Sequence, residues 1–294
     1  MPAAESKCGG MAKVILPIPT TDFDPTEVAV PWRELTGRGH EVVFATPDGA
    51  PGRADELMLT GEGLDPWGFI PGLAKLTLVG RILRANHNGR AAYERMVLDP
   101  GFRRPMRWQD VTSDAFDGLV LPGGHRARGM RVFLESPVIQ RLATEFFRLG
   151  KPVGAICHGV LVLARSADAE TRRSVLYGRR TTALTWRLEK LAASLARATR
   201  WWDPNYYRTY PEAVGQGAGY MSVQQEVTRA LRAPADFLDA PPDAPRRQTS
   251  GLVRDSDSDL TPAFVVRDGA YVSARWPGDA HLFAKTFADV LVGR

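Results

Sequence analysis

The chain has 294 residues, of which 44% are hydrophobic and 24% charged, as in a soluble globular protein rather than a disordered or fibrous one. The net charge of +5 comes from arginines that alternate with acids along the chain, which argues against a nucleic-acid partner. Two cysteines argue against a disulfide framework and suit a reducing cytoplasm, and no apolar run is long enough to cross a membrane.

Apolar strands and amphipathic helices alternate after a leader, residues 1–12, that we expect to be flexible. The predicted elements are strands at 13–18, 41–45, 116–121 and 153–156, with helices at 25–38 and 136–149. This alternation predicts a mostly parallel sheet with helices on both faces, in a single α/β domain over 13–294.

Two long segments interrupt the alternation. Residues 50–110 contain apolar helical stretches at 73–83 and 90–97 but no clear strand, which predicts a helical insertion. Residues 233–260 are rich in Pro, Asp, Ala and Arg and predict a long surface loop. The other predicted elements are a strand at 178–184, a helix at 186–198, a hairpin at 263–267 and 271–274, and a helix at 279–292.

Cys157 is the residue best placed for chemistry. It follows the buried strand 153–156 and precedes an apolar helix, and Gly159 allows that helix to approach closely. Unpaired N–H groups at a helix start favour a thiolate over a thiol, so this position suits a nucleophile. The alternative is a buried structural cysteine in an apolar run.

Glu27 follows the first strand and is expected at the same edge of the sheet as Cys157. It can act as a proton donor or acceptor, because a carboxyl group near a thiolate has a raised pKa. The alternative is helix capping, since Asp24 and Glu27 have capping-box spacing. Pro31 cannot donate to the carbonyl of Glu27, which indicates a distorted helix.

Other candidates follow the third long strand and the nucleophile. Gly123 and Gly124 can present backbone N–H groups to an oxyanion. His158 and His125 are rival imidazole partners of the thiol. Glu189 and Asp168 are the candidate acids to orient the histidine.

An aromatic segment, 201–210, is expected either in the core or on a pocket wall. Tyr207 and Arg208 are its candidate substrate contacts. The five histidines and two cysteines lack the close spacing of metal ligands, so no metal or other cofactor is expected.

These residues together resemble the DJ-1/PfpI (ThiJ) superfamily, which has a class I glutamine amidotransferase-like fold. The resemblance is carried by Ala155-Ile156-Cys157-His158-Gly159, by Leu121-Pro122-Gly123-Gly124-His125, and by Glu27. It implies a flavodoxin-like, doubly wound sheet, with the helical insertion of the larger glyoxalase III and chaperone-like members. It further implies Cys157 as nucleophile, Glu27 as its acidic partner and His158 as the completing base.

The resemblance implies a cofactor-free, lyase-type enzyme that acts on a small reactive carbonyl compound, as glyoxalase III converts methylglyoxal to lactate. A homodimer with a role in stress response is also implied. The alternatives are a hydratase or hydrolase at the same thiol, resembling isocyanide hydratases or peptidases, and a holding chaperone or oxidative-stress sensor. Glutaminase activity is not expected, because the late His281 is followed by Phe283 rather than by a glutamate at that position.

Overall fold

A seven-stranded sheet forms the centre of the molecule, which a computed structural model describes for residues 10–293. Its order is β5-β3-β1-β6-β7-β9-β8, parallel except where β8 meets β9. The strands are β1 (Lys13–Pro17), β3 (Glu41–Thr46), β5 (Met106–Arg107), β6 (Gly118–Leu121), β7 (Val153–Ile156), β8 (Val265–Asp268) and β9 (Tyr271–Ala274). The flavodoxin-like α/β prediction is therefore confirmed.

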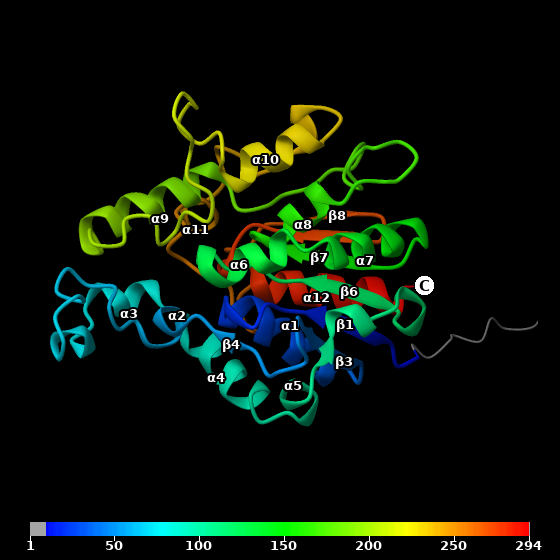
Figure 1. The fold of residues 1–294 in the computed structure, drawn as a ribbon, viewed down its shortest axis with the longest axis horizontal. Helices are drawn as coiled ribbons and strands as arrows, with labels where there is room; N and C mark the ends of the chain where they lie inside the picture. Colours follow the sequence, from blue (N-terminus) through cyan, green and yellow to red (C-terminus); the bar gives the residue numbers. More distant parts are fainter. Residues whose placement is uncertain (1–9, 294) are drawn as a thin grey trace, which may run out of the picture.

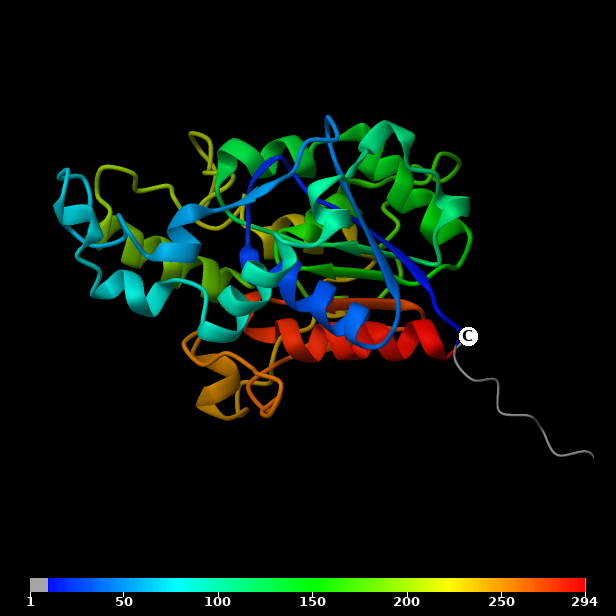
Figure 2. The same ribbon diagram turned by 90° about the horizontal axis from the view of Figure 1, so that it is seen from below.

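Helices cover both faces of this sheet (Figures 1 and 2). One face carries α1 (Pro25–Gly37) and α12 (Ala280–Val292), and the other carries α6 (Ala127–Leu134), α7 (Pro137–Arg148) and α8 (Gly159–Arg165). Glycines let α12 pack closely: a Cβ on Gly154 would lie 2.9 Å from the ring of Phe283. Burial of such apolar faces is the main stabilising contribution to a fold of this kind.

The chain between β3 and β6 is largely helical, and it lies to one side of the sheet (Figure 1). Its helices are α2 (Glu56–Thr60), η1 (Leu73–Lys75), α3 (Val79–Leu83), α4 (His87–Met96), α5 (Pro100–Arg103), η2 (Trp108–Asp110) and η3 (Ser113–Ala115). The predicted helix at 73–83 is divided into η1 and α3. The segment also contains strands that the sequence analysis missed, β5 and β4 (Arg53–Ala54), and β4 pairs with β2 (Thr21–Phe23).

The chain after α8 contains α9 (Trp186–Thr199), α10 (Val223–Ala230), η4 (Pro234–Asp236), α11 (Arg246–Thr249) and η5 (Pro277–Asp279). The predicted strand at 178–184 is wrong, since this segment makes only an isolated bridge between Thr181 and Phe237. The hairpin is confirmed as β8 and β9. Helices α6 and α10 were not predicted.

The predicted flexible leader lies mostly outside the described residues. Its last residue, Ala12, is buried and accepts a hydrogen bond from Glu41 N at 2.9 Å. Among the helices of residues 10–293, none has the length and apolar character needed to cross a membrane.

Candidate active site

Cys157 lies in the turn between β7 and α8, where the carboxyl ends of β1, β6 and β7 meet. Its φ of 58° is in the left-handed region, which costs a non-glycine residue conformational energy and is found most often at functional sites. Its backbone N–H donates to the carbonyl of Ala274 at 3.0 Å. Gly159 permits the tight turn, because a Cβ there would lie 2.7 Å from the carbonyl oxygen of Pro122. The backbone therefore holds this side chain at the edge of the sheet.

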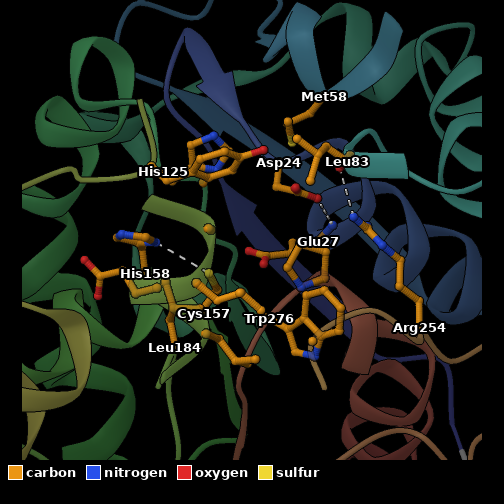
Figure 3. A pocket seen from close by; sticks show the side chains of 18 of the residues that line it. Asp24, Glu27, Met58, Leu83, His125, Cys157, His158, Leu184, Arg254 and Trp276 are labelled. Carbon is orange, nitrogen blue, oxygen red and sulfur yellow. Dashed lines mark hydrogen bonds between the residues drawn. The ribbon is translucent and has the colours of Figure 1, made fainter. Parts of the chain in front are cut away.

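Glu27 points toward Cys157 from the first turn of α1 (Figure 3). Asp24 caps this helix by accepting from Thr26 N at 2.8 Å and Glu27 N at 3.1 Å. The Glu27 side chain does not complete a capping box; its Oε2 accepts from Gly123 N at 2.7 Å. The Gly123 amide thus positions Glu27, while Gly124 lines the adjacent cavity.

Burial raises the pKa of both Cys157 and Glu27 above the ordinary value of each group. Burial raises the pKa of Cys157 well above its ordinary value, and the negative charge of Glu27 raises it further, against a backbone hydrogen bond from His158 that lowers it. Burial likewise raises the pKa of Glu27, with the neighbouring Asp24 adding to the effect. Desolvation of the thiol therefore acts against the effect of the helix start, and the expectation of a resting thiolate stays a prediction.

His158 is the imidazole that faces the thiol. Its Nδ1 lies 3.4 Å from Cys157 Sγ (Figure 3). Burial lowers the pKa of His158 to about 3, so the ring is neutral. Within residues 10–293, its Nε2 has no hydrogen-bond partner.

Glu189 lines the same cavity as His158 from α9. It forms an ion pair with Arg208 at 3.0 Å and accepts from Val223 N at 3.0 Å. Burial raises the pKa of Glu189 to about 7. Its assignment as the acid that orients His158 stays a prediction.

His125 and Tyr207 both line the cavity, with their ring centroids 4.5 Å apart. Burial lowers the pKa of His125 to about 4, so this ring is also neutral. Arg208 lies behind Glu189, where it also pairs with Glu212 at 2.7 Å and lies over the ring of Trp186. The aromatic segment thus contributes one pocket residue and one buried ion-pair partner.

The thiol, Glu27 and His158 share a cavity of about 150 Å³. The lining residues that were not proposed as site residues include two charged side chains and a tryptophan: Asp24, Arg254 and Trp276. Trp276 follows β9, whose carboxyl end lies beside that of β7, so the parallel order of the strands could have indicated it. Arg254 comes from the predicted surface loop, and nothing in its local sequence indicates the pocket.

In the part of the chain that the structure describes, no group of three His, Cys, Asp or Glu side chains is placed to hold a metal ion.

Comparison with known proteins shows the family and the fold of the chain. The sequence model described as ThiJ/PfpI family-like matches residues 18–218. An uncharacterized protein of Schizosaccharomyces pombe is 29% identical over 158 residues, which are 53% of this chain and 51% of that protein. The chain therefore spans about half of that relative's length.

Two further similarities concern shorter or more distant matches. A deglycase of Pyrococcus abyssi is 38% identical over 72 residues, covering 24% of this chain and 42% of that protein. The crystal structure of glyoxalase III from Candida albicans superimposes with a TM-score of 0.58 at 16% identity, covering 95% of this chain and 97% of that one. At that identity the second match shows the fold alone.

Proposed function

Because the chain belongs to the ThiJ/PfpI-like family, we propose that it is a cysteine-dependent enzyme that acts on small reactive carbonyl compounds. The observation that carries the proposal is the arrangement at the end of β7: a thiol with a neutral imidazole 3.4 Å from its sulfur and a buried carboxyl group beside it. The relatives named deglycase and glyoxalase III support this substrate class. We further propose a cytoplasmic homodimer that needs no cofactor.

With methylglyoxal the reaction begins by addition of sulfur to the aldehyde carbon. His158 Nδ1 accepts the thiol proton, a C–S bond forms, and the carbonyl π pair moves to oxygen. The backbone N–H groups of Gly124 and His158 stabilise this oxyanion until the imidazolium returns the proton to it. The product of this step is a hemithioacetal.

Glu27 then moves a proton between two carbons. Its carboxylate removes the hydrogen from the former aldehyde carbon, giving an enediolate, and its carboxylic acid returns the proton to the neighbouring carbon. The hydroxyl proton on the C–S carbon passes to the former ketone oxygen. The C–S carbon becomes a thioester carbonyl. Water hydrolyses the thioester, lactate leaves and the thiol is regenerated, so the balance is methylglyoxal plus water to lactic acid. A carboxyl group with a raised pKa suits both transfers.

The test replaces the nucleophile. Cys157→Ser and Cys157→Ala should abolish formation of lactate from methylglyoxal, a loss of at least about 10³-fold, while circular dichroism and Tm show a folded protein. A panel of amides, esters and isocyanides, followed by mass spectrometry, tests the hydrolase and hydratase alternatives with the same variants. Lactate formation by Cys157→Ser at near the normal rate would refute the mechanism.

A second candidate function, holding unfolded proteins, is favoured by one observation. The segment that contains η1 and the approach to α3 exposes a cluster of large apolar side chains; these are Phe69, Ile70, Leu73, Leu76 and Leu78. Exposed clusters of this kind mark interaction sites. Leu76→Ser/Leu78→Ser should weaken suppression of light scattering by a heat-unfolded client protein, whereas Cys157→Ser should leave it unchanged. Equal suppression by all three proteins would exclude this cluster as the holding surface.

A further inference from the structure

Arg254 is the charged residue of the pocket that the proposed reaction does not use. In Figure 3 it lies across the pocket from His158, with Cys157 and Glu27 between them. Its Nη2 donates to the carbonyl of Leu83 at 3.2 Å, and its guanidinium lies 5.4 Å from the centroid of the Trp276 ring. The side chain is therefore held in one place by two contacts.

One nitrogen of this guanidinium is left without a partner. Nη1 is buried and forms no hydrogen bond with any residue from 10 to 293. A buried donor without a partner costs free energy, and a guanidinium nitrogen more than most. Carboxylates are the preferred partners of such a nitrogen, because the two groups form short, charge-assisted hydrogen bonds.

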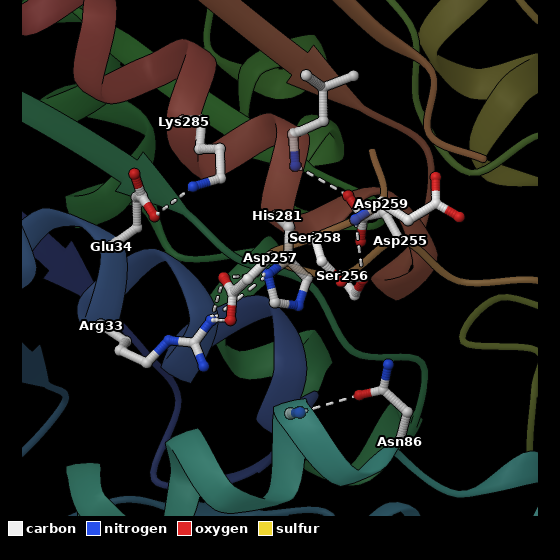
Figure 4. A network of polar contacts seen from close by, with 12 residues as sticks. Arg33, Glu34, Asn86, Asp255, Ser256, Asp257, Ser258, Asp259, His281 and Lys285 are labelled. Atoms are coloured by element: carbon white, nitrogen blue, oxygen red, sulfur yellow. Dashed lines mark hydrogen bonds and ion pairs between the residues drawn. The ribbon is translucent and has the colours of Figure 1, made fainter. Parts of the chain in front are cut away.

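The segment after Arg254 is fixed to the protein by further contacts (Figure 4). Asp255 accepts from Leu282 N at 2.8 Å at the start of α12. Asp257 pairs with Arg33 at 2.7 Å and with His281 at 3.0 Å. The position of Arg254 is thus determined by contacts to both α1 and α12, as expected for a group that must be preorganised.

Of the residues that the structure describes, Arg254 is the one arginine or lysine that lines the cavity, where the acidic side chains are Asp24, Glu27 and Glu189, the last paired with Arg208. His125 and His158 are neutral, because burial lowers the pKa of each, to about 4 and about 3. Burial raises the pKa of Asp24 and that of Glu27, while the positive charge of Arg254 acts to lower both. A carboxylate ligand therefore complements the charge of Arg254, the residue with an unpartnered nitrogen.

We propose that Arg254 binds a carboxylate of the substrate, so that the enzyme acts on carbonyl compounds that also carry a carboxylate group. The remainder of such a substrate is apolar, since Leu188, Leu191 and Leu195 of α9 form one wall of the cavity. The carbonyl part of this inference rests on the proposed function, whereas the carboxylate part rests on Arg254 alone.

The first test uses two alkylating agents of nearly equal size. Iodoacetate carries a carboxylate and iodoacetamide does not, and the rate of Cys157 alkylation by each is measured by peptide mass mapping, which separates it from Cys8. The ratio of the iodoacetate rate to the iodoacetamide rate should fall at least about 10-fold in Arg254→Gln, the usual effect of losing a charged hydrogen bond. Arg254→Lys should give an intermediate ratio.

The control for loss of one positive charge is Arg107→Gln, because Arg107 is exposed and paired with Asp110 at 2.8 Å; its ratio should equal that of the wild type. An unchanged ratio in Arg254→Gln would overturn the proposal. So would an equal fall of both rates, which is the result expected if Arg254 only holds the loop against Leu83.

The second test separates this inference from the carbonyl reaction. 4-Oxobutanoate should protect Cys157 from iodoacetamide at about 10-fold lower concentration than butanal in the wild type, and at equal concentration in Arg254→Gln. If neither aldehyde protects while iodoacetate selectivity persists, the carbonyl reaction is refuted and the anion site stands. If both protect equally in the wild type, carboxylate recognition is refuted.

Discussion

Substitution of Gly123 should test most directly whether the close packing of the site residues is required for activity. Its N–H holds Glu27 at 2.7 Å, and its Cα faces the reactive groups. A Cβ built on it would lie 2.7 Å from Glu27 Oε2, 2.8 Å from His158 N and 3.0 Å from Cys157 Cβ. The substitution Gly123→Ala therefore adds one methyl group where three site residues already meet.

The size of the effect follows from which neighbours can move. The contact to His158 N is about 0.6 Å shorter than the 3.4 Å at which ordinary contacts begin, and this nitrogen belongs to the fixed turn before α8. Glu27 must therefore move away. Overpacking of this kind costs about 1–3 kcal/mol of unfolding free energy, or a Tm lower by roughly 2–12 °C in a chain of this size. Displacing a catalytic group by a large fraction of an ångström should lower kcat/KM about 100-fold.

The assay pairs a thermal melt with lactate formation from methylglyoxal. Gly37→Ala is the matched control: Gly37 lies in α1, and a Cβ there would meet no atom of the described protein within 4 Å. This variant should keep wild-type activity and a Tm equal or slightly higher. If Gly123→Ala retained both its Tm and kcat/KM, the close packing of Glu27 against the Cys157 turn would be refuted as a requirement of the site.

Two further predictions concern protons. Glu27→Gln should shift the pH profile of Cys157 alkylation by iodoacetamide to lower pH, because the charge of Glu27 and its hydrogen bond both raise the pKa of the thiol; a shift to higher pH would mean that Glu27 stabilises a thiolate instead. Burial raises the pKa of Asp255 to about 8, so the folded protein keeps a proton that the unfolded chain loses near pH 4. Between these two pH values the free energy of unfolding therefore falls as pH rises, by up to about 1.4 kcal/mol per pH unit. Asp255→Asn should therefore lose less stability between pH 5 and pH 8 than the wild type in urea titrations. The control is Asp259→Asn, because the Thr261 hydroxyl lowers the pKa of Asp259; it should keep the wild-type slope of unfolding free energy against pH. Equal slopes for all three proteins would contradict the raised pKa of Asp255.

The part of the pocket around the thiol could be predicted, because each of its residues follows the end of a strand. Cys157, Glu27 and Gly123 follow three strands that are adjacent in the sheet, as β7, β1 and β6. Parallel strands bring their carboxyl ends to one edge, so the order of the motifs along the chain was sufficient to bring them together. The ionisation state of the thiol could not be predicted in this way, because burial at the end of the strand is a property of the complete fold.

The predicted strand at 178–184 failed because the sheet offers it no partner there. Both edges of β9 are occupied, by β7 and by β8. Thr182 N instead donates to the Ser273 hydroxyl at 3.0 Å, and the Thr181 hydroxyl lies 2.8 Å from that of Tyr271. Hydrogen bonds to side chains thus replace the backbone hydrogen bonds expected of a strand. This outcome depends on residues about ninety positions away.

The part of the pocket around Arg254 could not be predicted, and the reason is related. Arg254 reaches the cavity only because Asp255 and Asp257 attach its loop to α12 and α1, and because Leu83 of the helical segment accepts its hydrogen bond. All of these contacts join parts of the chain that are distant in sequence. The groups proposed to attack the carbonyl follow strands of the sheet, whereas those proposed to meet the remainder of the substrate lie on the loop of Arg254 and on α9, outside the sheet. Substitutions in those segments should therefore change which carbonyl compound is accepted while leaving the chemistry at Cys157 intact, which is the separation that the ratio of the two alkylation rates measures.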